Sequence, residues 1–313
     1  MSNDSMRVFD RRLVRVHRDR AATNLADHDF LFREAAERLT ERLEDVNRRF
    51  EVALDLGCHR GEVAAAIKDR GGIETLVQCD LSAAMAEEAR KRTGGGAPTS
   101  APVLVADEEA LPFGTHAFDL VLSSLSLHWV NDLPGTLAQI RSCLKPDGLF
   151  MATLLGGQTL KELRAAWTEA ELAEESGAGL HVSPVAEVRD AGALLQRAGF
   201  ALPVVDADTL TVTYPDALAL MRDLKGMGET NAALERRKAP TRRATMARVA
   251  AEYERIFGDG EGRIPATFQI IYLTAWAPHE SQPKPLRPGS AKARLADALG
   301  GQERSAGEKA RPR

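Results

Sequence analysis

Apolar and polar residues follow two different periods along this chain, and the changes between the two periods outline its elements. Near-continuous apolar runs, typical of strands buried in a parallel sheet, occur at 52–56, 75–80, 103–106, 118–124 and 149–155. Stretches with apolar residues three and four apart, typical of amphipathic helices, lie between them at 63–70, 83–92 and 133–144. This alternation predicts an α/β fold: a doubly wound, mostly parallel sheet with right-handed crossovers.

The pattern loosens after the fifth predicted strand. Helices are expected at 160–175, 185–198, 216–225 and 241–257, and strands at 210–214 and 266–276. The helices between these last two strands predict an insert, about residues 215–260, that roofs the site. An amphipathic helix at 29–49 precedes the first strand. We therefore expect an N-terminal helical segment (1–50), a core domain (51–277) and a tail (278–313).

The composition of the 313 residues is that of an ordinary globular protein, with 44% hydrophobic and 27% charged residues. The formal net charge of −4 is too small to predict a nucleic-acid or membrane partner. No apolar run approaches the roughly 18 residues of a membrane span. The tail differs from this mean, because residues 281–313 hold eight Lys or Arg against three Asp or Glu, together with Pro, Gly and Ser. That composition predicts a flexible basic tail.

The compartment is indicated by the cysteines and the N-terminus. Cys58, Cys79 and Cys143 are scattered and form no C-x-x-C pair, which favours buried thiols in a reducing compartment. The first twenty residues lack the apolar core of a secretory signal, and acids interrupt them where an organelle presequence would be free of acids. The sequence favours a bacterial cytoplasm, or the mitochondrial matrix if the protein is eukaryotic. It leaves the oligomeric state open.

A basic face is predicted on a helix over residues 6–20, where arginines recur at helical spacing: Arg7, Arg11, Arg15 and Arg18. Such a face is either solvated or contacts a charged partner. His17-Arg18-Asp19 also has the H-x-D spacing of some iron sites, but residues two apart on a helix do not face each other.

The stretch Val52–Gly61 combines an apolar run, a carboxylate and spaced glycines. Asp55 interrupts the run, and Gly57 and Gly61 flank His59. A tight strand-to-helix turn of this kind is where a doubly wound sheet binds a nucleotide-like cofactor. The third glycine of a dinucleotide fingerprint, G-x-G-x-x-G, is missing. A Cβ at His59 is expected to crowd the cofactor or to demand a negative φ.

Polar residues also follow the next predicted strands. Asp80, with Leu81 beside it, stands near the place of the acid that takes ribose hydroxyls in such folds. Asp107 and Glu108 follow the third strand, where an acid either bonds an adenine amino group or complements a helix N-terminus. Ser123 is near the end of the fourth strand. These strand ends meet at one edge of a parallel sheet.

His128 follows the fourth predicted strand, at the edge where α/β sheets bind ligands. A histidine titrates near neutral pH, so this residue is the candidate for a base or positioning group facing the acceptor. The alternative is a structural histidine packed against Trp129 under the roof.

The turn resembles motif I of the class I S-adenosylmethionine-dependent methyltransferases, usually written D-x-G-x-G-x-G, with His59 in place of the middle glycine. The acids after the next two strands stand at their expected places. The resemblance implies a Rossmann-like methyltransferase fold with S-adenosyl-L-methionine as cofactor. The residues it assigns to cofactor binding are Asp55, Gly57, His59, Gly61, Asp80, Leu81, Asp107, Glu108 and Ser123.

Further stretches are similar to one branch of these proteins. Residues 107–113 and 123–134 resemble the branch of malonyl-acyl-carrier-protein methyltransferases and of a complex I assembly-factor family. The stretches that resemble the assembly factors themselves are 9–11, 156–164, 226–229, 265–270 and 279–281. This resemblance implies a protein substrate, the iron–sulfur subunit of respiratory complex I, and hydroxylation of one of its arginines.

The residues themselves leave three functions open. Methyl transfer needs mainly alignment of the acceptor, so no catalytic motif is expected beyond a tentative role for His128. Hydroxylation needs an oxygen-activating centre, but the seven histidines select no set of two His and one carboxylate, and no metal site is predicted. The three candidates are therefore an arginine-hydroxylating enzyme, an O-methyltransferase for an acyl carrier protein or small molecule, and a non-catalytic assembly chaperone.

Overall fold

The computed structural model describes residues 7–92, 102–174, 177, 179–185 and 187–283. Residues Met1–Pro278 form one compact unit, in which the N-terminal helices pack together with the core. Most of the predicted basic tail, residues 284–313, lies outside the described residues. No helix in the described part of the chain is long and apolar enough to cross a membrane.

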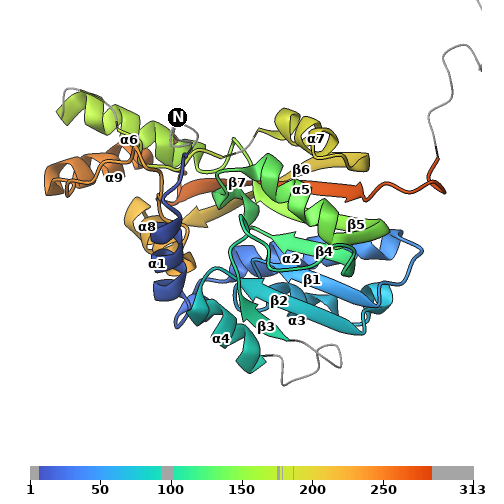
Figure 1. Cartoon of the computed structure of the whole chain (residues 1–313). Coiled ribbons are helices and arrows are strands. Elements are labelled where there is room, and N and C mark those ends of the chain that lie inside the picture. The colour runs from blue at the N-terminus through green and yellow to red at the C-terminus, as the bar shows by residue number, and fades with distance from the viewer. Residues whose placement is uncertain (1–6, 93–101, 175–176, 178, 186, 284–313) are drawn as a thin grey trace, which may run out of the picture. The chain divides into compact units, whose positions relative to one another are not determined.

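A seven-stranded sheet with the order β3-β2-β1-β4-β5-β7-β6 forms the centre of this unit (Figure 1). Its strands are β1 (Val52–Leu56), β2 (Thr75–Asp80), β3 (Val103–Val105), β4 (Phe118–Ser124), β5 (Leu144–Leu155), β6 (Ala201–Tyr214) and β7 (Ile264–Trp276). The first five are parallel, and β7 runs antiparallel to both β5 and β6. The predicted doubly wound, mostly parallel sheet is confirmed. The strand order reverses between β1 and β4, where such sheets bind ligands.

Helices cover both faces of the sheet because its central strands are apolar on both sides. On one face, α2 (Phe30–Glu41) and α3 (Glu62–Ile67) bury the side of β1 that carries Ala53. On the other face, α5 (Leu133–Cys143) packs on β5, and α7 (Val188–Arg197) packs beside α5 on β6 and β7. Helix α4 (Ala83–Arg92) packs against β2 and β3.

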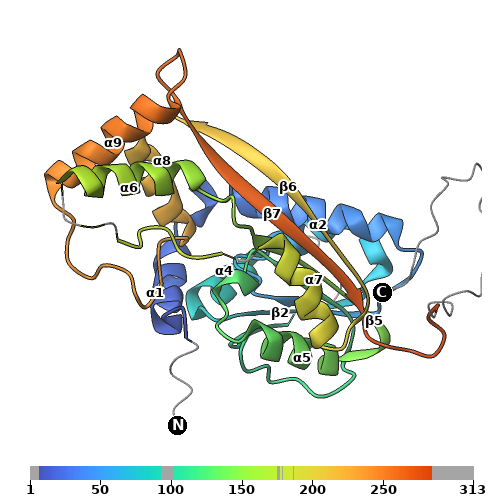
Figure 2. The same ribbon diagram turned by 90° about the horizontal axis from the view of Figure 1, so that it is seen from above.

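Four helices gather at one end of the sheet, where the parallel strands have their carboxyl ends, as Figures 1 and 2 both show. These are α1 (Arg11–Ala21), α6 (Lys161–Glu174), α8 (Ala217–Met227) and α9 (Arg243–Phe257). Helices α8 and α9 lie between β6 and β7 in the chain, where the sequence predicted an insert. Their apolar faces share one core with α2, α6 and β7.

Two elements differ from the sequence prediction. Strand β6 begins at Ala201 rather than Leu210, because an edge strand needs no apolar run and tolerates Pro203 and the bulge beside it. The strand predicted at 149–155 begins at Leu144 as β5, and residues 145–148 form a bulge in it, where the pairing register with β4 shifts and Asp147 has a φ of 63°.

Candidate functional site

The turn after β1 is held against the end of β2. The backbone N–H groups of Gly57 and Cys58 both donate to the carbonyl of Cys79, at 2.8 and 2.9 Å. Gly57 has a φ of 71°, and a Cβ there would lie 2.0 Å from the hydroxyl oxygen of Ser126. Gly61 has a φ of 83° and precedes α3. Both glycines are required by conformation, and Gly57 also by the close approach of another chain segment.

Of the two expectations for His59, the negative φ is wrong. Its φ is 49°, so the loop holds a non-glycine residue in the left-handed region rather than at negative φ. The imidazole is buried: Nε2 lies 3.2 Å from the carbonyl oxygens of both Ser124 and Leu125, and the ring packs on Phe32 at 4.5 Å. These contacts offset the backbone strain and fix the side chain within the protein.

Asp80 lies at the carboxyl end of β2 and is fully buried. Its Oδ2 accepts from the backbone N–H of His59 at 3.0 Å, and its Oδ1 accepts from that of Ser82 at 2.8 Å. Leu81 is half-buried and packs against the cluster that includes Val14 and Trp129. The carboxylate is thus fixed directly beside the glycine turn.

The predicted basic face on α1 is wrong for two of its arginines, which face inward. Arg18 is 2% exposed and reaches three side chains in the site. Its guanidinium lies 3.3 Å from Asp80 Oδ1 and donates to Glu108 Oε1 and Ser126 Oγ, each at 2.9 Å. Arg11 pairs with Glu108 and, at 2.5 Å, with Asp107. The acids at the ends of β2 and β3 are therefore neutralised from within the chain, by helix α1.

Burial and charge act against each other in this cluster. Burial disfavours the charged form of Arg18, but Asp80 and Glu108 outweigh it and raise its pKa. Burial likewise opposes ionisation of Glu108, yet Arg18 and Arg11 hold its pKa well below the usual range. Asp107 forms a turn with Ala110 rather than opening a helix, so the helix-dipole interpretation of this acid is wrong. The cluster is a set of paired charges.

Asp55 and Ser123 lie inside the sheet. Ser123 donates its hydroxyl to the carbonyl of Leu56 at 2.7 Å, which links β4 to β1. Asp55 is fully buried, and neither of its carboxyl oxygens has a hydrogen-bond partner. Burial, with the nearby Glu62 and Asp80, raises its pKa well above the ordinary value. Both polar side-chain atoms of Gln78 on β2 are also buried without a partner.

These features fit a nucleoside cofactor. The glycine turn brings backbone N–H groups to the carboxyl edge of the sheet, and the acids after β2 and β3 line the same edge. Buried polar atoms of Asp55 and Gln78 beside the turn have no hydrogen-bond partner among the described residues. Buried polar atoms of this kind are commonly satisfied by a ligand or a water molecule.

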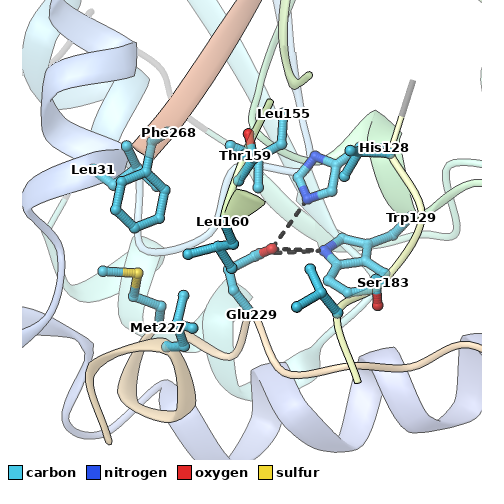
Figure 3. A pocket seen from close by; sticks show the side chains of 13 residues that line it. Leu31, His128, Trp129, Leu155, Thr159, Leu160, Ser183, Met227, Glu229 and Phe268 are labelled. Atoms are coloured by element: carbon cyan, nitrogen blue, oxygen red, sulfur yellow. Dashed lines mark hydrogen bonds and ion pairs between the residues drawn. The ribbon is translucent and has the colours of Figure 1, made fainter. Parts of the chain in front are cut away.

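The segment that follows β4 separates the glycine turn from a pocket of about 450 Å³, which His128 and Trp129 of that segment line. Its walls come from α2, the end of β5, the loop after α8 and β7 (Figure 3). The lining residues are Leu31, His128, Trp129, Leu155, Thr159, Leu160, Val182, Ser183, Val185, Leu224, Met227, Glu229 and Phe268. This volume includes open solvent at its mouth, and the lining is mostly apolar with a few polar groups, as in ligand sites.

Glu229 is the acidic residue of this pocket, and its carboxylate is turned toward His128 and Trp129 (Figure 3). Nε2 of His128 lies 3.1 Å from Glu229 Oε2, and the indole N–H of Trp129 donates to the same oxygen at 3.1 Å. Burial opposes ionisation of Glu229, but His128 and these hydrogen bonds keep its pKa below the usual value. His128 also packs on Trp129, with ring centroids 5.3 Å apart, so both interpretations of His128 describe part of its surroundings.

Similarity to proteins of known name extends over almost the whole chain. It is 45% identical over 298 residues to an arginine-hydroxylase NDUFAF5 of Danio rerio, covering 95% of this chain and 91% of the relative. The chain belongs to the NDUFAF5 arginine-hydroxylase family. The human protein of this family is also 45% identical, over 92% of this chain and 82% of its own length.

The NDUFAF5 family is itself related to methyltransferases. A malonyl-[acyl-carrier protein] O-methyltransferase of Xylella fastidiosa is 35% identical over 87% of this chain and 89% of its own length. A methyltransferase-domain model matches residues 54–152. Phosphoethanolamine N-methyltransferase 2 of Haemonchus contortus, solved with S-adenosyl-L-methionine, has a TM-score of 0.53 at 15% identity, covering 85% of this chain and 60% of that structure. The fold is that of the class I methyltransferases, whose cofactor is S-adenosyl-L-methionine.

Sequence reasoning missed three site residues of this NDUFAF5 family member. Arg11 and Arg18 were assigned to a surface face, and Glu229 was noted only within a stretch of resemblance. Apolar Val14 on α1 was the available signal, since it indicates that one side of that helix is buried and Arg18 lies one turn further along. Nothing in the local pattern marks Glu229, which reaches the pocket from the loop after α8.

The described part of this NDUFAF5 family member holds no group of three His, Cys, Asp or Glu residues placed for an ion. His17 Nδ1 bonds the hydroxyl of Thr230 at 2.9 Å, and Asp19 accepts from Ser82 at 2.5 Å. The two residues of the H-x-D spacing thus face different partners.

Proposed function

We propose that this protein modifies an arginine side chain of a protein, by hydroxylation, as the names of its relatives describe. The supporting observation is the extent of the similarity. The methyltransferase-domain model ends at residue 152, whereas the 45% identity to the named arginine hydroxylase covers 95% of the chain. It therefore includes α8 and the loop of Glu229, which contribute Leu224, Met227 and Glu229 to the pocket that would take the acceptor.

The cofactor site of this proposal is the edge formed by the ends of β1, β2 and β3. Asp80 would take the ribose hydroxyls, and Asp107 with Glu108 would face the adenine end. The turn of Gly57 and Gly61 would admit the cofactor backbone closely. His59, Leu81, Asp55 and Ser123 would support that edge from behind. S-adenosyl-L-methionine would supply a methylsulfonium group when bound, which provides no oxygen atom. Hydroxylation would therefore draw on a separate oxidant of the dioxygen class together with a two-electron reductant, with one oxygen atom entering the arginine and the other leaving as water.

The partner that we propose is the iron–sulfur subunit of respiratory complex I during assembly. The support is the resemblance of residues 156–164 and 226–229 to the assembly-factor family, together with the names of the relatives. The place of action would be the bacterial cytoplasm, or the mitochondrial matrix in a eukaryote, since the eukaryotic relatives are named mitochondrial.

A second candidate is O-methylation of a malonyl group on an acyl carrier protein. It is favoured by the 35% identity to the enzyme of Xylella fastidiosa, which likewise spans most of both chains. A malonyl group ends in a carboxylate, however, and the acidic Glu229 in the pocket would repel it.

The experiment is mass spectrometry of complex I subunits from cells with and without the gene. An arginine that gains the mass of one oxygen atom only when the gene is present supports the proposal. A gain of one methyl group would instead assign a methyltransferase. If complex I shows no mass change that depends on the gene, and malonyl-acyl carrier protein is methylated only when the gene is present, the second candidate is favoured.

A further inference from the structure

The ionisable groups of the acceptor pocket are Glu229 and its partner His128. Most of the remaining lining is aliphatic or aromatic, and no Lys or Arg is among its described lining residues. Glu229 is 7% exposed, and His128 helps to hold its pKa below the usual range, so a buried carboxylate is ionised at neutral pH. A ligand that enters this pocket therefore meets an apolar wall around a carboxylate whose Oε1 does not face His128. That chemistry suits a cation on an aliphatic stem.

The carboxylate of Glu229 has acceptor capacity left. An ionised carboxylate offers about four lone-pair positions. The indole N–H of Trp129 is shared between Oε2, at 3.1 Å, and Oε1, at 3.2 Å, and only Oε2 also faces His128. A planar guanidinium can bond both oxygens of one carboxylate, which an ammonium cannot do with the same geometry.

Glu229 also stands where two hollows meet. A second pocket, of about 570 Å³, is lined by Trp167, His181 and Asn231 and shares Leu160, Leu224 and Glu229 with the first. A third hollow adjoins the first at His128 and Val185 and includes the exposed Val8. A side chain on a protein substrate can therefore approach from more than one direction and end at this carboxylate.

The carboxylate lies close to the cofactor edge. Ser126 bonds Arg18 and Glu108 on the cofactor side, and His128, two residues further on, bonds Glu229 on the acceptor side. Glu229 is also near enough to contribute to the raised pKa of Arg18. A group held by Glu229 would thus lie next to the cofactor site.

We propose that Glu229 is the specificity-determining residue that binds the guanidinium of the substrate arginine, and that His128 and Trp129 position its carboxylate. This inference rests on the proposed function, because an arginine substrate gives the pocket its ligand. It goes further by assigning the residue that selects this side chain.

The binding test uses three blocked peptides that differ at one residue: arginine, citrulline (its neutral isostere) and lysine. Binding is followed by the NMR shift of the Trp129 indole N–H, assigned with Trp129→Phe. Wild-type protein is expected to prefer the arginine peptide over the citrulline peptide by about tenfold or more, since a charged hydrogen-bonded pair is lost. Glu229→Gln should abolish that preference. Lysine should bind less tightly than arginine.

The matched control is Glu162→Gln, the same change at a buried carboxylate outside the pocket. Glu162 bonds Thr267 on β7 and is not among the pocket residues. It should leave the arginine preference intact. If Glu229→Gln does not fold, Glu229→Asp keeps the charge on a shorter arm, and a reduced but measurable preference for arginine is expected.

Complementation of a strain without the gene separates the two proposals. Arginine modification with wild-type and Glu162→Gln protein, but not with Glu229→Gln, supports the assignment. Modification that persists in Glu229→Gln overturns the role of Glu229 and leaves the proposed function standing. If even the wild type gives no modification, the proposed function fails, and the peptide preference alone then decides whether Glu229 binds a guanidinium. Equal binding of the arginine and citrulline peptides by wild-type protein would overturn the inference.

Discussion

The two sides of the short segment Ser126–Trp129 use buried carboxylates in opposite ways. On the cofactor side, Glu108 and Asp80 face the guanidinium of Arg18, so negative charge is matched within the chain. On the acceptor side, Glu229 meets a histidine nitrogen and an indole N–H, and no arginine or lysine is among the described residues that line its pocket. A carboxylate that faces an arginine of the same chain has its charge balanced by that arginine, whereas one without such an arginine can take the guanidinium of a ligand.

The comparison also separates two parts of the fold. The cofactor edge is built from consecutive strand–turn units, β1 to β4, closed by one helix from the N-terminus. The acceptor pocket joins residues from α2, β5, the loop after α8 and β7, which are far apart in the chain. Regions assembled in this second way depend on long-range packing, and we expect them to set acceptor choice.

The largest effect is expected from Arg18→Met. This change leaves Asp80 and Glu108 buried without their counter-charge, and the loss of one partner of a buried ion pair costs about 3–5 kcal/mol. Urea denaturation at neutral pH should show a fall of that size in the free energy of unfolding. Arg15→Met, on the exposed side of the same helix, should change it by no more than about 0.5 kcal/mol. Equal effects of the two variants would mean that the Arg18 cluster is not a matched set of charges.

Asp80→Asn should act on the cofactor as well as on the fold, because Arg18 loses part of its counter-charge and the amide NH₂ would face one of two backbone N–H donors. The amide keeps the shape but loses the charge and one acceptor, so S-adenosyl-L-methionine should bind roughly tenfold to a hundredfold more weakly in isothermal titration. Glu229→Gln, the corresponding change on the acceptor side, should leave cofactor affinity within about threefold of wild type. A large cofactor defect in Glu229→Gln, or none in Asp80→Asn, would erase the distinction between the two sides.

Acid should weaken the cofactor-side cluster. The pKa of Glu108 is lower in the folded protein than its ordinary value of 4.5. The stabilisation from its ionised form is therefore complete above about pH 4.5 and is lost as the pH falls toward the folded-state pKa. Thermal unfolding between pH 7 and pH 3 should show this loss in the wild type. In Arg18→Met the Glu108 contribution should be reduced, so a slope as steep as that of the wild type would contradict the assignment.

The smallest effect is expected from His59→Gly. Glycine relieves the left-handed conformation but deletes the imidazole packed on Phe32 and against two carbonyl oxygens. Relief of backbone strain and loss of the imidazole contacts act in opposite directions. We expect the loss to be larger, so that the free energy of unfolding falls by about 1 kcal/mol. The sequence suggested tighter cofactor binding from this change. Since protein contacts already fix the ring, we now expect cofactor affinity, measured by isothermal titration, to stay within about threefold of wild type. A tenfold gain in affinity would instead support the expectation that the Cβ of His59 crowds the cofactor.

What the sequence determined by itself is the first half of the sheet and the turn at its edge. Strands that are apolar on both sides have few other ways to be buried, and the left-handed φ at Gly57 and Gly61 leaves a readable mark in residue type. Strict alternation of strand and helix then allows few topologies, so the parallel arrangement of β1 to β5 was predicted from pattern alone.

Tertiary structure alone decided which charges meet. Arg18 looked like one of four surface arginines, because helical spacing gives the side of a helix but not what packs against it. Glu229 lies 101 positions after His128, and only the packing of the loop after α8 brings their side chains to 3.1 Å. The edge strand β6 was underestimated for the same reason, since a strand paired on one side needs no apolar run. Local sequence fixes local conformation, whereas the site depends on contacts between segments whose separation leaves no periodic signal.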